Sequence, residues 1–555
     1  MIIRFLGAAD CVTGSCHLIA TDTHQILLDC GQFQGGKTLE ERNDDAFDFD
    51  PKAIDAVIVS HAHIDHSGRL PLLVKRGYSG PIYCTDATAD LLTIMLPDGA
   101  HIQEMEAQQA TRKALRRGEP PVEPNYTQAD VEATLRLVKP ILYDTLFEIN
   151  DQMKACFNEA GHILGSAITE IWVDEGEGAK KIVYTGDIGM DDRPILRDPK
   201  PIKKADYVIM ESTYGDRNHK SGDENLEELI QVILRTVKRG GNVVIPAFAV
   251  GRTQDLIYQL NGYYEDHPQY RDVLDRVDVY IDSPMAISTT EIFRRNAQVF
   301  DEATRERIYS GDNPLDFKNL YFFRTADESK ALNEEKRPKI LIAASGMCDA
   351  GRIRHHLKHN LWNEKSTIVF VGYQAEGSLG RMLLDGAKKV TLFGEKIAVK
   401  AEVVRLEGFS GHADQQSLLK WVKGLRQAPR QIFLVHGEEE GKNALQRLIE
   451  KETGYPCIAV PGVSEFTLSD QARMDYREAQ ADMAEGADEK EILGILERVS
   501  LQLMDMLEGG MADGLPLQRR TALHQHALQL EKDVLNLGMA LAAQENETNL
   551  PIEKK

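Results

Sequence analysis

The amino-acid sequence predicts an α/β layered protein with more than one domain. Short apolar runs, rich in valine and isoleucine and bounded by turn or polar residues, alternate with segments of helical periodicity. The chain has 555 residues, which is too long for one simple core. Hydrophobic residues make up 42% and charged residues 27%, as in an ordinary globular protein. These observations favour helices packed on buried sheets.

The predicted strands and one clear helix follow one another along the chain. Each strand is a compact apolar run that ends at a polar or turn residue. They cover residues 54–60, 180–187, 205–213, 241–247, 277–282, 339–345, 366–372 and 430–437. A helix is predicted over 223–241, with Gly240 as its stop signal.

The last part of the chain has a different pattern. From about Asp470 onward no convincing strand is visible, and apolar residues recur at a spacing of three to four from Ile492 to Leu507. We therefore predict a small helical appendage over 470–545, followed by a disordered end. Packing on the body or on a second subunit is the first interpretation, and binding of a partner is the alternative.

Charge and cysteine content limit the class of protein. The net charge is −22, which lowers the expectation of a nucleic-acid substrate, although a multivalent metal site would add local positive charge. Seven scattered cysteines without a C-x-x-C motif argue against disulfides and against a thiolate zinc site, and favour a reducing cytoplasm. No apolar run is long enough to span a membrane, and we see no secretory signal at the N-terminus.

The stretch SHAHIDHSGRLP, residues 60–71, contains three histidines and one aspartate within six positions. It follows a predicted buried strand, and the loops at the carboxyl ends of strands are where α/β proteins place their sites. Imidazole and carboxylate groups bind Zn²⁺ or Mn²⁺. Residues 61 and 63 should point to one side and residues 65 and 66 to the other, which suits two metals that share a bridge. The alternative, an accidental histidine cluster on an exposed turn, is disfavoured by the specificity of the pattern.

Two metals need further ligands, and residues of the right type stand at other strand ends. Each of these residues alone could be a capping aspartate or a hydrogen-bonded loop histidine. As a set beside glycines, which let backbones approach closely, they indicate one site. They are His162, Asp187, His436 and Asp29.

The motifs HAHIDH, AGHILGSA and TGDIG, which follow LLDCG, resemble the ordered motifs of the metallo-β-lactamase superfamily. The second half is similar to its nucleic-acid-processing branch, the β-CASP family, through Glu211 in MESTYGDR, His412 in GFSGHAD and His436 in LVHGE. The similarity covers roughly residues 1–465. It is greatest to bacterial and archaeal ribonucleases related to the endonuclease subunit of the eukaryotic pre-mRNA cleavage machinery.

This resemblance implies a fold and a domain order. Residues 1–205 and 396–468 would form a metallo-β-lactamase αββα sandwich. Residues 206–395 would form an inserted α/β β-CASP domain that closes over the metals. Residues 469–555, the helical C-terminal extension, depart from the family pattern and inherit nothing from it.

The resemblance also implies roles for the site residues. Two Zn²⁺ ions, with Mn²⁺ as the alternative, would lower the pKa of a water molecule and offset charge on the phosphate. His412, paired with Glu211, matches the position of the general acid, and the catalytic residues would be Asp65, Asp187, Glu211 and His412. Asp29 would orient the ligands from behind. The metal ligands would be His61, His63 and His162 for one ion, Asp65, His66 and His436 for the other, and Asp187 between them.

Phosphate contacts are predicted at two turns. Ser345 and Gly346 in ASGM present backbone N–H groups, and Ser378 and Arg381 lie in GSLGR, where the arginine could grip a phosphate. The alternative is that both are ordinary tight turns.

The leading functional hypothesis is a two-metal ribonuclease of RNA processing or decay. It would cut single-stranded RNA as an endonuclease, with 5′→3′ exonuclease activity as a second mode. RNA is favoured over DNA because, in the family, DNA-directed members carry an aliphatic residue where this chain has His436. The alternatives are a DNA nuclease and a small-substrate metallo-hydrolase. A binding protein with a dead site is disfavoured, since every metal position holds a competent ligand. A homodimer is the family expectation.

Overall fold

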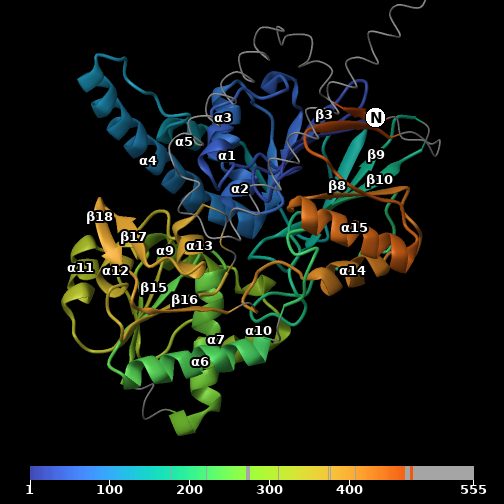
Figure 1. Ribbon diagram of the computed structural model, residues 1–555. Coiled ribbons are helices and arrows are strands. Elements are labelled where there is room, and N and C mark those ends of the chain that lie inside the picture. Colours follow the sequence, from blue (N-terminus) through green and yellow to red (C-terminus); the bar gives the residue numbers. More distant parts are fainter. Residues whose placement is uncertain are drawn as a thin grey trace, which may run out of the picture. The chain divides into compact units, whose positions relative to one another are not determined.

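The computed structural model describes residues 1–176, 178–219, 222–270, 276–310, 312–372, 374, 377–406, 408–468 and 476–478. In these ranges the chain builds two large mixed sheets and a third, parallel sheet, with helices against their faces (Figure 1). The predicted α/β class is confirmed. The helices of the described ranges include none with the length and apolarity needed to cross a membrane.

The first two sheets contain the two ends of the described chain. Within the described ranges, the first sheet has eight strands, in the order β23-β22-β1-β2-β3-β4-β5-β6. Their bounds are β1 Ile2–Gly7, β2 Cys16–Ala20, β3 Gln25–Leu28, β4 Ala56–Ile58, β5 Ile82–Thr85, β6 Val138–Ile141, β22 Ser464–Thr467 and β23 Tyr476–Glu478. The second sheet has seven described strands, in the order β21-β20-β11-β10-β9-β8-β7. Their bounds are β7 Leu146–Glu148, β8 Met153–Glu159, β9 Ala167–Val173, β10 Lys180–Tyr184, β11 Tyr207–Glu211, β20 Gln431–Val435 and β21 Cys457–Ala459.

These two sheets share one apolar core. Phe5 and Ile58 of the first sheet pack in the same cluster as Phe157, Ile209 and Phe433 of the second, and all five are fully buried. Helices cover the outer face of each sheet, so the αββα sandwich is confirmed. On the first sheet lie α3 (Leu70–Lys75), α4 (Asp86–Arg117) and α5 (Gln128–Leu137), and on the second lie α14 (Gln415–Lys423) and α15 (Glu439–Thr453). The short helices α1 (Lys37–Glu41) and α2 (Ile64–Ser67) belong to loops of the first sheet.

The third sheet belongs to the inserted segment. Its described strands pair in parallel, in the order β14-β13-β15-β12-β16-β19. The central strands β15, β12 and β16 are buried along their whole length, because both faces of the sheet are covered there. The strands are β12 Val243–Pro246, β13 Asp278–Ile281, β14 Leu320–Phe322, β15 Lys339–Ala343, β16 Thr367–Phe370 and β19 Glu402–Arg405. The helices are α6 Gly222–Lys238, α7 Arg252–Asp266, α9 Pro284–Arg295, α10 Glu302–Tyr309, α11 Ala326–Glu334, α12 Ile353–Asn360 and α13 Leu379–Leu384. A separate hairpin is formed by β17 Lys389–Leu392 and β18 Glu395–Ala398.

The eight strands expected from the sequence are all present, as β4, β10, β11, β12, β13, β15, β16 and β20, and the helix over 223–241 is α6. The sheets divide the chain differently from the expected ranges, however. Strand β11 pairs with β10 and β20 in the sandwich, whereas β19 pairs with β16 in the inserted sheet. The range 206–395 therefore includes β11, which belongs to the sandwich, and the range 396–468 includes β19, which belongs to the inserted sheet. The sequence ranges fail here because the sheet that a strand joins depends on partners distant in sequence.

The expectation that no strand follows Asp470 is wrong. Strand β23 pairs antiparallel with β22, and it adds an edge to the first sheet. Its three residues supply too little periodicity to be recognised in the sequence. The rest of the predicted helical appendage over 470–545 lies outside the described residues.

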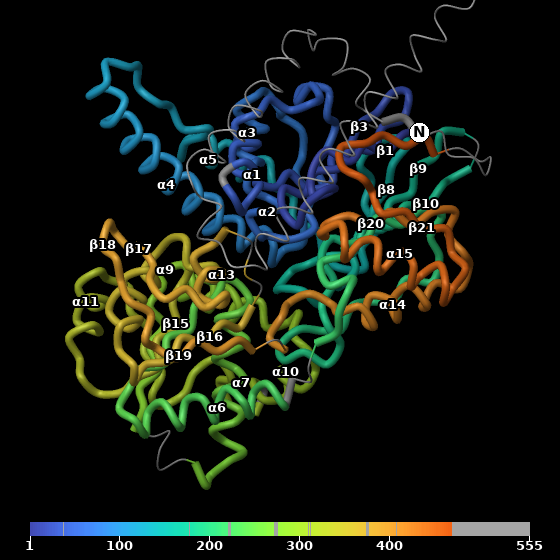
Figure 2. The backbone as a smooth tube through the Cα atoms, viewed as in Figure 1, coloured from blue at the N-terminus to red at the C-terminus, as the bar shows by residue number. Residues whose placement is uncertain are grey.

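The chain returns to its beginning after the insertion. Figure 2 shows the orange segment of β20 and β21 lying beside the teal strands of the N-terminal part. Strand β22 then pairs with β1, so the sandwich is closed by residues more than four hundred positions apart. Loops from both ends of the chain consequently meet at one edge.

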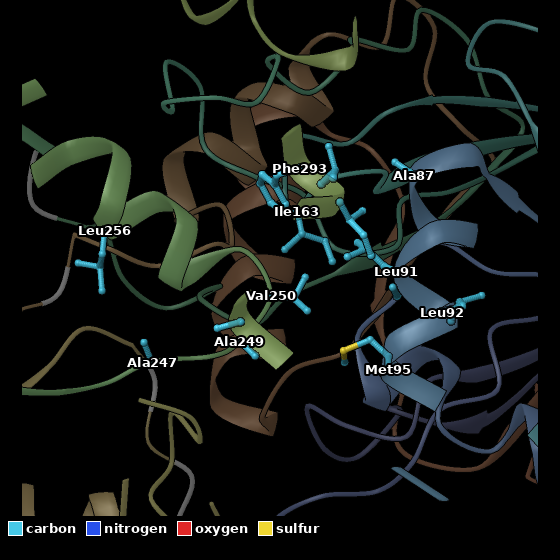
Figure 3. Close-up of a cluster of buried hydrophobic side chains, with 14 of the residues drawn as sticks. Ala87, Leu91, Leu92, Met95, Ile163, Ala247, Ala249, Val250, Leu256 and Phe293 are labelled. Atoms are coloured by element: carbon cyan, nitrogen blue, oxygen red, sulfur yellow. The ribbon is translucent and has the colours of Figure 1, made fainter. Parts of the chain in front are cut away.

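An apolar cluster connects the inserted segment to the sandwich. Figure 3 shows Leu91 and Met95 of α4 facing Phe293 of α9 and Val250, with Ile163 between them. All of them are buried. The Nδ2 of Asn296 also donates to Asp90 Oδ2 at 2.9 Å. These contacts hold the insertion against the loops that carry the predicted metal ligands.

Candidate metal centre

The loop after β4 divides its side chains between two groups, as the sequence predicted. His61 and His63 join His162 in the first group, where His63 Nδ1 lies 3.0 Å from His61 Nε2 and 3.2 Å from His162 Nε2. Burial lowers the pKa of all three imidazoles, that of His63 to about 4, so the rings are neutral at pH 7. Neutral ring nitrogens that converge in this way are suited to bind a cation.

The second group contains Asp65, His66 and His436. His66 Nε2 lies 3.1 Å from His436 Nε2, and Asp65 Oδ2 lies 3.6 Å from the same His436 nitrogen. Asp65 and His66 stand on α2, which begins directly after His63. His436 follows β20, where its backbone has a φ of +49° that turns the chain at the sheet edge.

Asp187 lies between the two groups. Its Oδ2 is 3.5 Å from the Nε2 atoms of both His61 and His162, whereas its Oδ1 is 3.4 Å from His66 Nε2. Oδ1 is buried and has no hydrogen-bond partner among the described residues. Burial alone would raise the pKa of this carboxyl, but the surrounding imidazoles hold it well below its usual range. An ionised carboxylate with one oxygen toward each nitrogen cluster has the chemistry of a bridging ligand.

Asp29 and Thr213 orient the imidazoles from behind. Asp29 follows β3 and its Oδ2 accepts from His66 Nδ1 at 2.7 Å, from Ser60 Oγ at 2.7 Å and from Tyr184 Oη at 2.6 Å. The hydrogen bond to Nδ1 leaves His66 Nε2 directed at the site. Thr213 Oγ1 lies 3.1 Å from His436 Nδ1 and has the same effect on that ring.

Glu211 and His412 form a pair on the inner side of the site. His412 Nδ1 lies 3.1 Å from Glu211 Oε2 and 3.8 Å from Asp187 Oδ2. Burial by itself would lower the pKa of His412, but the carboxylates of Glu211 and Asp187 raise it to about 9. His412 is therefore a protonated imidazole at pH 7 whose second nitrogen is free of this pair. Such a group can donate a proton.

A cavity of about 220 Å³ lies between the sandwich and the insertion, and His63, Asp65, His162, Asp187, His412 and His436 are among the residues that line it. Two arginines that the sequence analysis did not single out line it as well. Arg193 Nη2 and Arg252 Nη1 both donate to Asp255 Oδ2, at 2.5 and 2.7 Å, so that two positive charges share one negative charge. Among the described residues Arg193 Nη1 has no hydrogen-bond partner, and it lies beside Gly411, the neighbour of His412.

A local sequence pattern marks Arg252 of this arginine pair, whereas none marks Arg193. Arg252 and Asp255 follow Gly251 at the start of α7, at a spacing that joins them on one helix face. Arg193 lies in a loop after β10, with no pattern to mark it. Only the packing of the insertion on the sandwich brings the two side chains together.

The four predicted phosphate-binding residues do not line this cavity. Ser378 Oγ caps α13 by accepting from the Arg381 N–H, and Arg381 Nε donates to both carboxylate oxygens of Asp385. Gly346 packs against the ring of Phe248, and Gln374 Nε2 donates to the carbonyl oxygen of Gly346. Ser345 Oγ is buried and has no hydrogen-bond partner in the described part of the chain. Met347, the last residue of the ASGM turn, lines the cavity instead.

Comparison with known protein families matches three successive parts of the chain. The model of the "Metallo-beta-lactamase superfamily" matches residues 9–247, that of the "Beta-Casp domain" matches 253–383, and that of the "Zn-dependent metallo-hydrolase RNA specificity domain" matches 396–461. Ribonuclease TTHA0252 of Thermus thermophilus is 40% identical over 443 residues, which cover 80% of this chain and 94% of the relative. The chain belongs to the β-CASP family of the metallo-β-lactamase superfamily.

Other β-CASP relatives have different names. Transcription termination factor FttA of Methanocaldococcus jannaschii is 33% identical over 467 residues, covering 82% of this chain and 70% of the factor. An RNase J-like protein of the same organism is 33% identical over 461 residues, covering 82% of this chain and 97% of the relative. The β-CASP resemblance inferred from the motifs is thus confirmed, and the chain is a metal-dependent hydrolase of this family.

The residues present fit the metals that the β-CASP family implies. Asp187 Oδ1, a buried carboxylate oxygen without a hydrogen-bond partner among the described residues, is costly unless a cation lies against it, and the imidazole nitrogens converge at about 3 Å beside it. The donors are nitrogen and oxygen atoms, which suit the borderline ion Zn²⁺ and which Mn²⁺ also accepts.

Proposed function

We propose that this β-CASP protein is a two-metal ribonuclease that hydrolyses phosphodiester bonds in single-stranded RNA. Internal cleavage is the principal mode, with 5′→3′ exonuclease activity as a second mode at free 5′ ends. The single observation that carries the proposal is the position of Asp187, whose two oxygens face two separate imidazole clusters. The match to an RNA specificity domain over 396–461 and the ribonuclease name of the 40% identical relative support RNA as the substrate.

The ligands divide as the geometry suggests. One ion would be held by His61, His63 and His162, the other by Asp65, His66 and His436, and Asp187 would belong to both. Zn²⁺ is the favoured ion because five of these seven groups are imidazoles, and Mn²⁺ is the alternative. When bound, two such ions lower the pKa of a water molecule and offset negative charge on a phosphate.

The chain's own residues would manage the leaving group. In hydrolysis of the P–O bond the departing ribose oxygen must gain a proton. His412 is on the cavity wall, and Glu211 holds its Nδ1, so that Nε2 is left to donate toward that oxygen. Glu211 is itself fixed, since its Oε1 accepts from the Ile188 N–H at 2.6 Å. Glu211 thus acts through His412, which is the proton donor.

The arginine pair would bind the RNA backbone next to the reacting phosphate. Arg193 and Arg252 bring one positive charge more than Asp255 neutralises, in a chain that is acidic overall. A locally positive cleft attracts a polyanion regardless of the sign of the net charge. Arg193 Nη1 is the atom best able to donate to a phosphate oxygen, since it has no hydrogen-bond partner within the described residues.

Two alternatives to RNA cleavage remain testable. A small-substrate hydrolase has no need of an inserted domain that is fastened over the metals by the contacts of Leu91 and Met95 with Phe293. A DNA nuclease would fit the same metal set, and His436 is the residue that argues against it. We also propose a cytoplasmic homodimer. All seven cysteines are free, in keeping with a reducing compartment.

The test is a cleavage assay with 5′-labelled single-stranded RNA and the matching DNA, with products sized and bound metal measured in parallel. Internal cuts in RNA alone are expected, with two metals per chain. Equal cleavage of DNA would overturn the choice of RNA. No cleavage of either strand by protein that carries both metals would overturn the nuclease proposal. Light scattering on the full chain should give twice the monomer mass.

A further inference from the structure

Helix α12 of the insertion presents a cationic and aromatic face to solvent. Its other face is apolar, since Ile353, Leu357 and Leu361 are fully buried in the core beneath it. The outward residues recur every fourth position, which places them in one stripe along the helix. This stripe consists of Arg354, His355, Lys358 and His359, which are exposed or half-buried. Trp362, in the turn that follows the helix, is exposed as well.

The hairpin β17–β18 extends this face. In Figure 1 the hairpin lies beside α12 on the insertion. Its turn residue Phe393 stacks on His355, with the ring centroids 4.3 Å apart, and the Arg354 guanidinium carbon lies 5.1 Å from the same ring. Glu395 pairs with Lys358 at 2.7 Å. These contacts fix the hairpin against the helix, so the two elements form one surface.

The charge of this surface is opposite to that of the chain. Segments 353–363 and 386–401 together contain six lysines and arginines and one glutamate, whereas the whole chain has a net charge of −22. The single glutamate, Glu395, is already paired with Lys358. Lys389 and Lys396 of the hairpin are exposed. A local excess of cations of this size favours a polyanionic partner.

Two aromatic side chains are exposed at the ends of the same surface. Trp362 is 58% exposed and Phe393 is 50% exposed, more than any other aromatic residue among the described large hydrophobics. Phe393 stacks at His355 near the start of α12, whereas Trp362 follows the end of this helix at Asn360. Exposed rings that far apart, with cations between them, suit the bases and phosphates of an extended strand.

We propose that this α12 surface, defined by Arg354, Lys358, Trp362, Phe393 and Lys396, binds single-stranded RNA at a distance from the metal centre. None of these residues lines the catalytic cavity. Bases would stack on Trp362 and Phe393, while the three cations contact phosphates. A duplex keeps its bases paired and offers no free faces, so the surface selects unpaired RNA. The proposal rests on the proposed ribonuclease function, and it gives long substrates a second contact that short ones lack.

Intrinsic fluorescence of the full-length, metal-loaded protein tests this surface directly. Of its three tryptophans, Trp421 is only 7% exposed and Trp172 is half-buried beneath Lys181, so Trp362 provides most of the accessible emission. A uridine oligonucleotide of about 30 nucleotides should quench that emission, and one of about six nucleotides in the catalytic cleft should not. The His412→Ala background slows cleavage during the titration. Trp362→Phe should remove the quenching while leaving the affinity close to that of the parent.

Variants then measure the contribution of the surface to activity. Trp362→Ala with Phe393→Ala should raise KM for the long RNA roughly ten-fold, with kcat and cleavage of the short RNA unchanged. Lys358→Gln with Lys396→Gln should reduce the salt dependence of binding. Matched controls are Tyr321→Ala, another exposed aromatic, and Lys154→Gln with Lys330→Gln, two exposed lysines that each pair with one carboxylate.

The outcomes separate this proposal from the proposed function. If the wild type cleaves RNA but the aromatic and lysine variants bind long RNA as tightly as the controls do, the α12 surface has no part in RNA binding. If long RNA quenches Trp362 but the wild type cuts no RNA, the surface stands and the ribonuclease proposal fails. Absence of both quenching and cleavage would overturn both.

Discussion

Asp29 Oδ2 accepts a hydrogen bond from His66 Nδ1 at 2.7 Å, and His66 Nε2 in turn points at His436 Nε2, 3.1 Å away. The carboxylate therefore determines which nitrogen of His66 faces the metal centre. Both residues are fully buried, so solvent offers no substitute for this contact. The ligand and the residue behind it depend on one another.

Asp29→Asn should weaken metal binding without removing a ligand. The amide cannot hold the imidazole as a carboxylate does, and loss of such partners typically costs about 10–100-fold in metal affinity. Metal content after dialysis against increasing concentrations of a chelator measures this loss of affinity. Tyr184→Phe, which removes only one of the hydrogen bonds to Asp29, is the matched control and should lose less. Equal metal retention by Asp29→Asn and the wild type would contradict the orienting role.

Asp187→Asn should abolish turnover and lower the occupancy of both metals together. Its two oxygens face the two imidazole groups, so one substitution affects both sites. His436→Ala should instead empty mainly one site, since it belongs to only one group. Metal analysis per mole of protein distinguishes these outcomes. Occupancy near one in Asp187→Asn, with the other site unaffected, would show that the carboxylate serves one metal alone.

Glu211→Gln should shift the alkaline limb of the pH–activity profile to lower pH. A proton donor is active below its pKa, so activity falls as pH rises through the pKa of His412, which is about 9. Removing the negative charge of Glu211 lowers that pKa, because a carboxylate stabilises the imidazolium. The amide oxygen can still accept from the Ile188 N–H, which preserves the backbone. If the alkaline limb does not move while the metal content stays intact, the pairing of Glu211 with His412 does not set the pH at which activity is lost.

Arg193→Gln should raise KM for RNA about ten-fold with a smaller change in kcat. It removes a guanidinium that lines the cavity, and a charge-assisted hydrogen bond to phosphate contributes about 1.5–3 kcal/mol. Arg381→Gln is the matched control, because that side chain pairs with Asp385 away from the cavity. Steady-state kinetics on one RNA substrate compares the two. A larger effect of Arg381→Gln would restore the original sequence prediction.

Gly31→Ala should damage both stability and metal content. A Cβ at this position would lie 1.6 Å from the Asp65 carbonyl oxygen and 2.8 Å from the His66 nitrogen, so the ligand loop must move. Overpacking that shifts backbone costs about 1–3 kcal/mol or more. Gly36→Ala meets nothing within 4 Å and should melt as the wild type does. Calorimetry with metal analysis reads both quantities. Unchanged melting of Gly31→Ala would mean that the loop is free to adjust.

The sequence by itself determined the chemistry of the centre. The sequence shows five histidines and two aspartates at or near strand ends, and His61 and His63 precede Asp65 and His66 in one loop. These residues could be recognised because ligand type and spacing within a loop are local properties. The buried strands could also be predicted from the sequence, since short apolar runs bounded by turn or polar residues are typical of buried strands. Glu211 and His412 came from the family resemblance, and their contact at 3.1 Å agrees with it.

Tertiary structure alone decided which strands share a sheet and which arginines reach the cavity. Strand β11 joins the sandwich and β19 the insertion because hydrogen-bonded partners are chosen over hundreds of residues, and no local pattern records that choice. Arg193 and Arg252 meet at Asp255 only when the insertion packs on α4. Arg381 lies in a glycine-rich turn and was therefore predicted to bind phosphate, but it pairs with Asp385, four residues later in the chain. The sequence determines the type of each side chain, whereas the tertiary packing around a side chain determines which partner it contacts.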